Sequence, residues 1–470
     1  MASKRETIAI IGGGAAGLGA AWLLDESFDI TIYEGAATLG GHARTVYVPS
    51  PAGSVPVDMG VVLTKPWGYP NLYGLLELLD VPTFSSGVTI GASFGPHDTW
   101  FTGGGGALWE RIREECSRFE LAMFQAGNLP EAERARPIRH LLRRQRYSRG
   151  FIDKALCPVL AMFVVTGSEP LDVPLSEIAS LFPEYFSFFA PITWRFFSRG
   201  THDYVERLAA RLRGKIRVAA PVAAVRRHRD GVTVVDASGN AARFDQVVIA
   251  TGADSARAIV MDATPLERTL LDSFRYARSR AYVHTDESVL SPYLPRSTSF
   301  QYTSFGDPIG PEFLGAVTYD VGAHYDAPGL FATLSWEGTE APLPRGILAS
   351  QTWAHLIVTP HVVRARARLH EIQGVRRTWY CGEYTTVVSH EGALVSGMAV
   401  AEAIGAKYPL AGLPLAAKGF AALRGMMFPK PLEKAAPERE RGARRPAPRP
   451  RAGEKRAAPR RSAAPGRARP

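Results

Sequence analysis

Three short segments at the start of the chain alternate between the patterns of a strand and a helix. Residues 7–11 form an apolar run of strand length, and residues 29–34 place Ile30 and Ile32 on one face of a second strand. Between them, residues 15–24 carry alanine and leucine at the spacing of a packed helix. The chain is therefore predicted to begin with a strand, a helix and a second strand, the order typical of an α/β sheet.

Further along, the pattern changes twice. Residues 61–199 carry longer helical stretches broken by loops rich in glycine and proline, whereas residues 216–250 return to short strands and residues 263–371 are mixed. The last predicted strand leads through Gly382 into a helix that starts near Gly392. The predicted helices are 71–79, 108–124 and 152–165, and the predicted strands are 222–226, 232–236, 246–250, 280–285, 330–336 and 378–381.

The composition is that of a soluble globular enzyme larger than one typical domain. Of the 470 residues, 46 % are hydrophobic and 21 % are charged, so we expect two interleaved domains. The three cysteines form no Cys-x-x-Cys pair, which supports neither a disulfide framework nor a metal site and favours the cytoplasm. The apolar run 8–24 resembles a signal peptide, but its five glycines favour a strand–turn–helix. No other segment is apolar over the about 18 residues of a membrane span.

The net charge of +10 lies entirely in the last part of the chain. Residues 430–470 contain 14 Lys and Arg against 4 Asp and Glu, whereas basic and acidic residues are equal in number before them. This Arg/Pro/Ala-rich segment cannot bury a core, and we predict that it is disordered. We favour a solvated spacer, with a polybasic contact with an anionic membrane or with nucleic acid as the alternative, and we expect no specific nucleic-acid partner.

A glycine motif follows the first strand and opens the first helix. In Gly12-x-Gly14-x-x-Gly17, the first glycine permits a tight turn, the second lets the backbone approach a pyrophosphate, and the third lets the helix and the strand pack closely. Glu34 ends the second strand 22 residues after Gly12, where a carboxylate accepts hydrogen bonds from a ribose diol and disfavours the 2′-phosphate of NADP. The motif predicts a dinucleotide and leaves NAD and FAD open.

Motifs near both ends of the chain decide between these two cofactors. They are Leu39-Gly40-Gly41-His42-Ala43-Arg44-Thr45, Val57-Asp58-Met59-Gly60, Trp379-Tyr380-Cys381-Gly382-Glu383 and Glu391-Gly392-Ala393-Leu394-Val395-Ser396-Gly397. Together they resemble the second glycine signature, the element that follows it and the C-terminal flavin motif of the flavin amine oxidase and phytoene desaturase superfamily. A helix that opens near Gly392 can direct free N–H groups at the pyrimidine edge of a flavin, and NAD has no need of such a second helix.

The resemblance implies FAD as the cofactor. The residues that it places around FAD are Gly12, Gly14, Ala15, Ala16, Gly17, Glu34, Gly40, Gly41, His42, Arg44, Thr45, Gly60, Val222, Thr251, Gly252, Gly382, Glu383, Gly392, Ala393 and Leu394. No metal is implied. His42 is assigned to the cofactor shell by its place in the second glycine signature, and Val222 is assigned to a backbone contact on the adenine side.

The resemblance also implies the fold. We expect an α/β fold in which a Rossmann-like FAD-binding domain is built from discontinuous segments and carries an inserted α+β substrate domain. The expected FAD-binding segments are 6–62, 203–262 and 372–408, the substrate domain is 63–202 and 263–371, and a C-terminal helical extension covers 409–429. Three motifs resemble a bacterial branch of predicted NAD/FAD-binding oxidoreductases and, more distantly, flavin-dependent polyunsaturated fatty-acid isomerases: Tyr69-Pro70-Asn71-Leu72, Gly200-Thr201-His202-Asp203-Tyr204-Val205 and Val283-His284-Thr285-Asp286.

The substrate is less defined than the cofactor. Amine oxidases of the superfamily typically hold a water against the flavin with a lysine of the substrate domain, and this chain has no lysine between Lys215 and Lys407. Residues 181–197 hold eight aromatic side chains that could line an apolar tunnel, although ordinary core packing is the more frequent role of such residues. Charging that tunnel, for example by Phe189→Asp, should then weaken lipid binding. We predict hydride transfer from a small, apolar fatty-acyl or polyene substrate, as desaturase, isomerase or dehydrogenase.

Two alternatives to this function stay open, and the catalytic residues are unknown. The alternatives are an amine oxidase that oxidises a C–N bond and a non-catalytic FAD- or lipid-binding protein. His390 and His284 are weak acid–base candidates because an imidazole titrates near neutral pH, and a structural role is the more common one for an isolated histidine.

Overall fold

The computed structural model describes residues 5–50, 53–164, 170–182, 185–305, 315–339 and 341–429. The basic segment 430–470, predicted to be disordered, lies outside the described residues, as does the end of the helix predicted at 152–165. No helix within these ranges is long and apolar enough to cross a membrane.

A five-stranded parallel sheet assembles from three distant parts of the chain, in the order β19-β13-β1-β2-β9. Its strands are β1 (Thr7–Ile11), β2 (Asp29–Tyr33), β9 (Lys215–Arg217), β13 (Gln246–Ile249) and β19 (Thr378–Tyr380). In β1, Ile8 and Ile10 enter one hydrophobic core, while Ala9 and Ile11 enter another on the opposite face. Because successive side chains of a strand point to opposite faces, this apolar run requires cover on both sides of the sheet.

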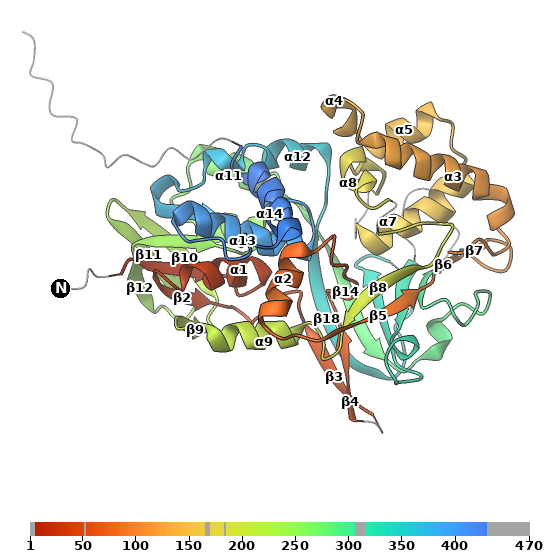
Figure 1. Cartoon of the computed structure of the whole chain (residues 1–470), viewed down its shortest axis with the longest axis horizontal. Helices are drawn as coiled ribbons and strands as arrows, with labels where there is room; N and C mark the ends of the chain where they lie inside the picture. Colours follow the sequence, from red (N-terminus) through yellow and green to blue (C-terminus); the bar gives the residue numbers. More distant parts are fainter. Residues whose placement is uncertain are drawn as a thin grey trace, which may run out of the picture. The chain divides into compact units, whose positions relative to one another are not determined.

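Helices cover the face of Ile8 and Ile10, and a second sheet with further helices covers the other face (Figure 1). The helical layer contains α1 (Ala15–Leu24), α2 (Pro70–Leu78), α9 (His202–Arg211), α13 (His390–Ile404) and α14 (Pro414–Met427). The opposite layer contains the antiparallel strands β10 (Val222–His228), β11 (Gly231–Asp236) and β12 (Ala241–Phe244) with α10 (Ala253–Ile259), α11 (Pro265–Leu271) and α12 (Pro360–Arg366). The predicted α/β fold built from discontinuous segments is confirmed.

Glycines let α1 and α13 approach closely. A Cβ atom added to Gly397 would lie 1.8 Å from the carbonyl oxygen of Ala16, and one added to Gly19 would lie 2.4 Å from that of Leu394. The backbones of α1 and α13, which come from opposite ends of the described chain, are therefore in close contact. Helix α2, which lies in the stretch expected to be substrate domain, packs in the same core.

A seven-stranded sheet forms the second part of the described chain, in the order β18-β14-β17-β16-β15-β6-β7. All neighbouring pairs are antiparallel except β6 and β15. Its strands are β6 (Ile90–Ser93), β7 (Thr99–Phe101), β14 (Tyr276–His284), β15 (Phe300–Ser304), β16 (Gly315–Asp320), β17 (Phe331–Trp336) and β18 (Ile347–Leu356). Two hairpin-like pairs accompany it: β3 (Thr45–Ser50) with β4 (Gly53–Asp58), and β5 (Thr83–Val88) with β8 (Ile192–Phe197).

Six helices of the described chain lie beside this sheet, and all of them except α4 contribute residues to its aromatic core (Figure 1). They are α3 (Trp109–Ala126), α4 (Glu131–Arg134), α5 (Ile138–Arg144), α6 (Arg149–Phe151), α7 (Cys157–Phe163) and α8 (Leu175–Ala179). The helix predicted from residue 152 begins as a π-helical turn, η1 (Ile152–Leu156), before α7. Single helical turns complete the chain at η2 (Pro170–Asp172), η3 (Glu287–Val289), η4 (Val321–Ala323), η5 (Leu369–Glu371), η6 (Val375–Arg377) and η7 (Glu383–Thr385).

Candidate functional site

The first glycine loop joins β1 to α1 in a geometry that only glycine tolerates. Gly12 has φ +106°, and its N–H donates to the carbonyl oxygen of Tyr33 at 2.8 Å. A Cβ atom at Gly12 would lie 2.6 Å from the Ala250 oxygen, and one at Gly17 would lie 1.8 Å from the Gly12 oxygen. The loop therefore packs without side chains, and Gly14 caps α1 so that the free N–H groups of the first helical turn point out of the loop.

The second glycine loop lies directly against the first. The N–H of Gly40 donates to the Gly13 oxygen at 2.8 Å, and Gly14 and Gly40 form a parallel bridge. Gly40 and Gly41 have φ +115° and +56°, the left-handed region that favours glycine. Two backbone loops thus form one cradle at the N-terminus of α1.

Glu34 follows β2 and turns its carboxylate toward this cradle. One oxygen accepts the N–H of Gly13 and the other accepts the N–H of Ala36, each at 2.7 Å. Each carboxylate oxygen has a second lone pair available, so the group can still accept the hydroxyls of a ribose.

A cavity of about 1160 Å³ runs from this cradle into the second part of the chain. The predicted cofactor residues that line it are Gly12, Gly14, Ala15, Ala16, Glu34, Gly40, Gly41, His42, Gly60, Val222, Thr251, Gly252, Gly382, Glu383 and Ala393. It exceeds the about 300–1,000 Å³ of an ordinary small-molecule pocket, so it has room for a dinucleotide and a second molecule.

Several predicted cofactor residues lie behind the cavity wall. Gly17 lies against Gly12, as its predicted packing role requires. Arg44 donates to the Thr38 hydroxyl, and Thr45 donates to Asp58 at 2.6 Å while accepting the N–H of His202 at 3.0 Å. Neither side chain lines the cavity, and the bonds of Thr45 give it a structural role.

The C-terminal flavin motif opens its helix two residues earlier than predicted. Helix α13 begins at His390, and the Ser389 hydroxyl accepts the N–H of Gly392 at 2.9 Å. The helix N-terminus therefore presents the N–H groups of His390 and Glu391 rather than that of Gly392. Gly392 is needed because a Cβ atom there would lie 2.1 Å from the Val387 oxygen, and Leu394 is fully buried against α1.

Of the two candidate histidines, only His390 faces the cavity. His284 is fully buried, accepts the N–H of Asp286 at Nδ1 (3.1 Å) and pairs through Nε2 with the Thr333 hydroxyl (2.8 Å). Both ring nitrogens of His284 are thus engaged in the second sheet. This geometry favours a structural role for His284.

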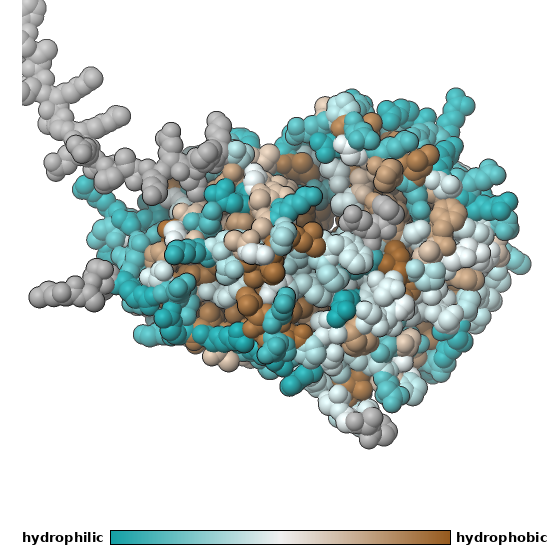
Figure 2. Space-filling model, viewed as in Figure 1, coloured by the Kyte–Doolittle hydropathy of each residue, from teal (hydrophilic) through white to brown (hydrophobic). Residues whose placement is uncertain are grey.

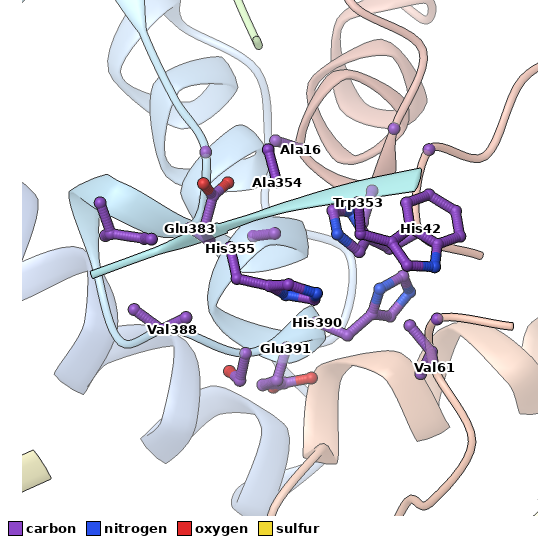
Figure 3. Close-up of a pocket in the computed structure, with 18 of the residues that line it drawn as sticks. Ala16, His42, Val61, Trp353, Ala354, His355, Glu383, Val388, His390 and Glu391 are labelled. Carbon is purple, nitrogen blue, oxygen red and sulfur yellow. The ribbon is translucent and has the colours of Figure 1, made fainter. Parts of the chain in front are cut away.

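Three imidazoles and an indole gather on one wall of the cavity (Figure 3). The His42 ring stacks on the Trp353 ring with their centroids 4.5 Å apart, and the centroids of the His42 and His355 rings are 5.5 Å apart. His390 pairs through Nε2 with the Tyr204 hydroxyl at 2.7 Å. We call His42, His355 and His390 the histidine cluster.

Burial keeps the histidine cluster neutral at neutral pH. Burial lowers the pKa of His42 to about 4, and burial together with the neighbouring His42 lowers the pKa of His390 to about 4 and that of His355 to about 3. His42 has exposed surface and lines the cavity, so a molecule bound there would shield it from water.

The sequence patterns missed Trp353 and His355, which both lie on β18. That strand pairs with β14, and the Trp353 indole donates to the Met59 oxygen at 2.9 Å, which ties the second sheet to the cofactor loops. The sequence offers one signal for them: if residues 351–355 form a strand, Gln351, Trp353 and His355 lie on the same face.

Two buried carboxylates, those of Asp58 and Glu391, accept hydrogen bonds that hold together the segments around this wall. Asp58 accepts the Thr45 hydroxyl together with the N–H and hydroxyl of Thr201, at 2.6–2.8 Å. Glu391 accepts two N–H groups of Asn71 and the N–H of Leu72, at 2.8–2.9 Å, and so caps α2. Burial raises the pKa of Asp58 to about 6 and that of Glu391 to about 7.

A family model for flavin-containing amine oxidoreductases matches residues 15–290, more than half of the chain. The chain belongs to this family. The match makes FAD its cofactor and the protein a flavin-dependent oxidoreductase. The residues present fit that cofactor: a cradle of glycines that side chains would fill, a carboxylate placed for the ribose, and the N-terminus of α13, all at one cavity. None of the curated protein sequences compared with the chain matches it.

Several solved structures share the fold of this chain at low sequence identity. The fatty acid isomerase from P. acnes that produces CLA is 16 % identical, with 86 % of this chain and 100 % of that chain covered at a TM-score of 0.67. A putative protoporphyrinogen oxidase from Exiguobacterium sp. 255-15 is 15 % identical, with 85 % and 99 % covered at 0.61. Cyclohexylamine oxidase from Brevibacterium oxydans IH-35A is 15 % identical, with 85 % and 99 % covered at 0.63. At these identities the comparisons show a shared fold, and they do not indicate which substrate this chain uses.

Proposed function

We propose that this flavoprotein removes hydride from an apolar substrate, a fatty-acyl or polyene compound, as a desaturase, isomerase or dehydrogenase. The observation that carries the proposal is the lining of the cavity beyond the histidine cluster. It is built from Val62, Leu63, Ile90, Met162, Phe163, Leu181, Tyr185, Trp194, Phe300, Val317, Tyr319, Ala332 and Leu334. Two carboxylates among the described residues line the cavity near this wall, and both are engaged: Glu177 pairs with Arg366 at 2.9 Å, and Asp58 accepts the hydroxyls of Thr45 and Thr201. A wall that is mainly apolar over the described residues favours burial of hydrocarbon, worth about 0.8 kcal/mol per CH₂.

Core packing explains most of the aromatic segment 181–197. Of its eight aromatic side chains, Tyr185 and Trp194 line the cavity, whereas Phe182, Phe186, Phe188, Phe196 and Phe197 are buried elsewhere. Phe189 is 42 % exposed and packs edge-on against Trp109 outside the cavity. Phe189→Asp is therefore unsuited to test the tunnel, and Phe163 is a better position.

FAD supplies the hydride acceptor when it is bound. The chain positions the reacting carbon by burial against the apolar wall and excludes water from it. His390 is the residue we propose for proton transfer: in the neutral tautomer whose Nε2–H donates to the Tyr204 hydroxyl oxygen, Nδ1 has the free lone pair that accepts a proton.

The amine oxidase alternative draws on the family name and on the amine substrates in the names of some relatives. The lysine that it calls for is missing between Lys215 and Lys407. Lys65 is buried at 2 % exposure, and its ammonium lies 4.5 Å from the centre of the Trp194 ring. Trp194 lines the cavity and Lys65 does not, so an aromatic wall lies between this lysine and the site. A non-catalytic FAD- or lipid-binding role is the second alternative.

We also propose a cytoplasmic location. All three cysteines are buried and free, which suits a reducing compartment.

An anaerobic screen separates these functions. The FAD-loaded protein is mixed with unsaturated fatty acids or with alkyl amines and polyamines, and flavin bleaching is followed. The lipids are also analysed for conversion, because an isomerase returns the hydride to its product and leaves the flavin oxidised. We expect the lipids either to bleach the flavin or to be isomerised without lasting bleaching. Rapid bleaching by amines with lipids inert would restore the amine oxidase, and neither bleaching nor lipid conversion would favour the non-catalytic alternative.

Two matched variants then test the wall. Phe163→Asp should raise the KM for the active lipid at least about tenfold, because a carboxylate would have to be desolvated against hydrocarbon, while FAD affinity stays unchanged. Phe189→Asp, with the same chemistry outside the cavity, should leave both constants near the wild-type values. Equal effects of the two variants on the KM would count against the proposed wall.

A further inference from the structure

Helix α14 forms one side of the opening of the cavity. Gly419, Ala422 and Leu423 of this helix line it together with Trp67, whose side chain is 51 % exposed. Contact between the two elements is direct, since a Cβ atom at Gly419 would lie 3.0 Å from the Pro70 ring. The opening is therefore bordered by a helix and by the loop that precedes α2.

The outer face of α14 is an apolar stripe. Leu415, Ala422 and Met426 are spaced by seven and four residues, which places them on one side of a helix. Leu415 is 50 % exposed and Met426 is 37 % exposed. Leu413, just before the helix, is 38 % exposed and borders an apolar groove against α2. Figure 2 shows apolar surface over the region of α2 and α14. We call Trp67, Leu413, Leu415, Ala422 and Met426 the rim.

The charged residues of α14 itself, Lys418 and Arg424, are basic. Residues 410–430 contain no Asp or Glu, and Lys418 is exposed on α14. Of the acidic residues of neighbouring elements, Glu402 pairs with Arg424 at 2.6 Å and Glu177 pairs with Arg366, whereas Glu77, exposed in the last turn of α2, lines the groove with Leu413 and Leu415. The chain then continues into the segment 430–470, which carries 14 basic and 4 acidic residues.

We propose that the rim is a docking surface for an anionic lipid bilayer, so that the cavity opens toward the membrane interface. An exposed apolar helix face with basic flanks is the pattern of interfacial binding, and a polybasic segment gains about 1 kcal/mol per Lys or Arg near an anionic surface. Each signal is weak alone, and stable attachment requires two. This chain supplies both within residues 413–470.

The inference goes beyond the proposed function, because docking requires no turnover. A bilayer fits the rim better than a protein partner does: the rim is one stripe beside an open cavity, and its charge complement lies in a Pro/Arg/Ala-rich segment without the apolar residues of a folded interface. If the substrate is apolar, the same placement delivers it from the lipid phase.

Vesicle sedimentation of the FAD-loaded full-length protein tests the proposal. Vesicles of phosphatidylcholine mixed with phosphatidylglycerol are compared with phosphatidylcholine alone. We expect binding to the anionic vesicles that weakens with salt. The double variant Leu415→Glu/Met426→Glu should lower the partition coefficient at least about tenfold, and so should a chain that ends at Pro429, since each removes one of the two signals.

The matched control is Leu121→Glu/Phe124→Glu on α3, where the side chains are 56 % and 71 % exposed and far along the chain from the rim. Its partition should stay within about twofold of wild type. Thermal melting and flavin absorbance confirm that all variants are folded, and Leu415→Ser/Met426→Ser replaces the glutamates if they are not.

Equal losses in the rim and control variants would overturn the proposal. So would a preference for duplex DNA over anionic vesicles that ignores the rim substitutions, because the tail would then be a nucleic-acid segment. A dimer that dissociates in the rim variant without any vesicle binding would assign the rim to a second copy of the chain and overturn it too. Intact vesicle binding with no lipid turnover would refute only the proposed substrate.

Discussion

Replacing Glu391 by glutamine should change how the stability of the apoprotein depends on pH. Glu391 is 3 % exposed, stands in the first turn of α13 and accepts three N–H groups of Asn71 and Leu72. It therefore links the helix of the C-terminal flavin motif to α2. Burial outweighs the three donors and raises the pKa of Glu391 to about 7 from its ordinary value of 4.5.

The sign follows from that pKa. A folded-state pKa above the unfolded value means that the folded chain keeps a proton which the unfolded chain releases. The resulting stabilisation is complete below about pH 4.5 and is lost as the pH rises through about 7. At about 1.36 kcal/mol per pH unit between the two pKa values, it amounts to roughly 3 kcal/mol. Between pH 5 and pH 8, the wild type should thus lose about 2–3 kcal/mol of unfolding free energy relative to Glu391→Gln.

Urea denaturation of the two apoproteins at both pH values measures this difference. Subtracting the variant from the wild type cancels the other titrating groups, including the buried histidines, whose lowered pKa values act in the opposite direction below about pH 6.5. Glu402→Gln controls for the loss of a glutamate from the same helix, since its carboxylate is partly exposed and paired with Arg424. A wild-type stability relative to the variant that is the same at both pH values, or that is higher at pH 8 than at pH 5, would refute the reasoning.

Three further predictions concern the cofactor and the tail. The purified protein should be yellow with one non-covalently bound FAD per chain, and a colourless protein that ignores FAD but binds NAD would contradict the assignment. Glu34→Ala should weaken FAD binding about ten- to a hundredfold, because a charge-assisted bond to the ribose is worth about 1.5–3 kcal/mol; fluorescence titration measures this, with the exposed Glu26→Ala as control, and an unchanged Kd would show that Glu34 is not the ribose ligand. A chain that ends at Pro429 should keep the Tm and FAD affinity of the full chain, because residues 1–430 form one compact unit, and a large drop in either would show that the tail supports the fold.

The cofactor end could be predicted because its constraints are local. Gly12 and Gly17 are five positions apart, and a side chain at Gly17 would meet the Gly12 backbone, so a short motif fixes most of this geometry. The apolar run of β1 likewise predicts a strand covered on both faces. What the motif could not show is that the Gly40 loop lies on the Gly13 oxygen, or that Ser389 takes up the N–H of Gly392.

The residues that line the substrate part of the cavity could not be predicted, because the pairing of strands that are distant in the sequence brings them together. Trp353 reaches His42 only through the pairing of β18 with β14, and no local pattern links residues 311 positions apart. Aromatic density was also a poor guide: Phe189 lies outside the cavity, whereas Phe163, in a different helix, lines it. Burial is favourable for an aromatic ring wherever space exists, so the number of rings in a segment does not tell which of them face a ligand.

The two ends of the cavity are lined by different kinds of atoms. Backbone atoms of loops line the part where FAD would bind, and side chains line the part where the substrate would bind. Around the glycine cradle the groups that would meet FAD are mainly backbone atoms of fixed loops, and the close contact of α1 with α13 at Gly397 sets their distance from the C-terminal motif. Beyond the histidine cluster the surface is made of side chains such as Phe163 and Phe300, which can change without moving a backbone loop. A fold of this design keeps its flavin while its substrate varies, which is why structures named for a fatty acid isomerase, a protoporphyrinogen oxidase and an amine oxidase share it. The identity of the substrate must therefore be sought in the apolar wall and not in the motifs that reveal the family.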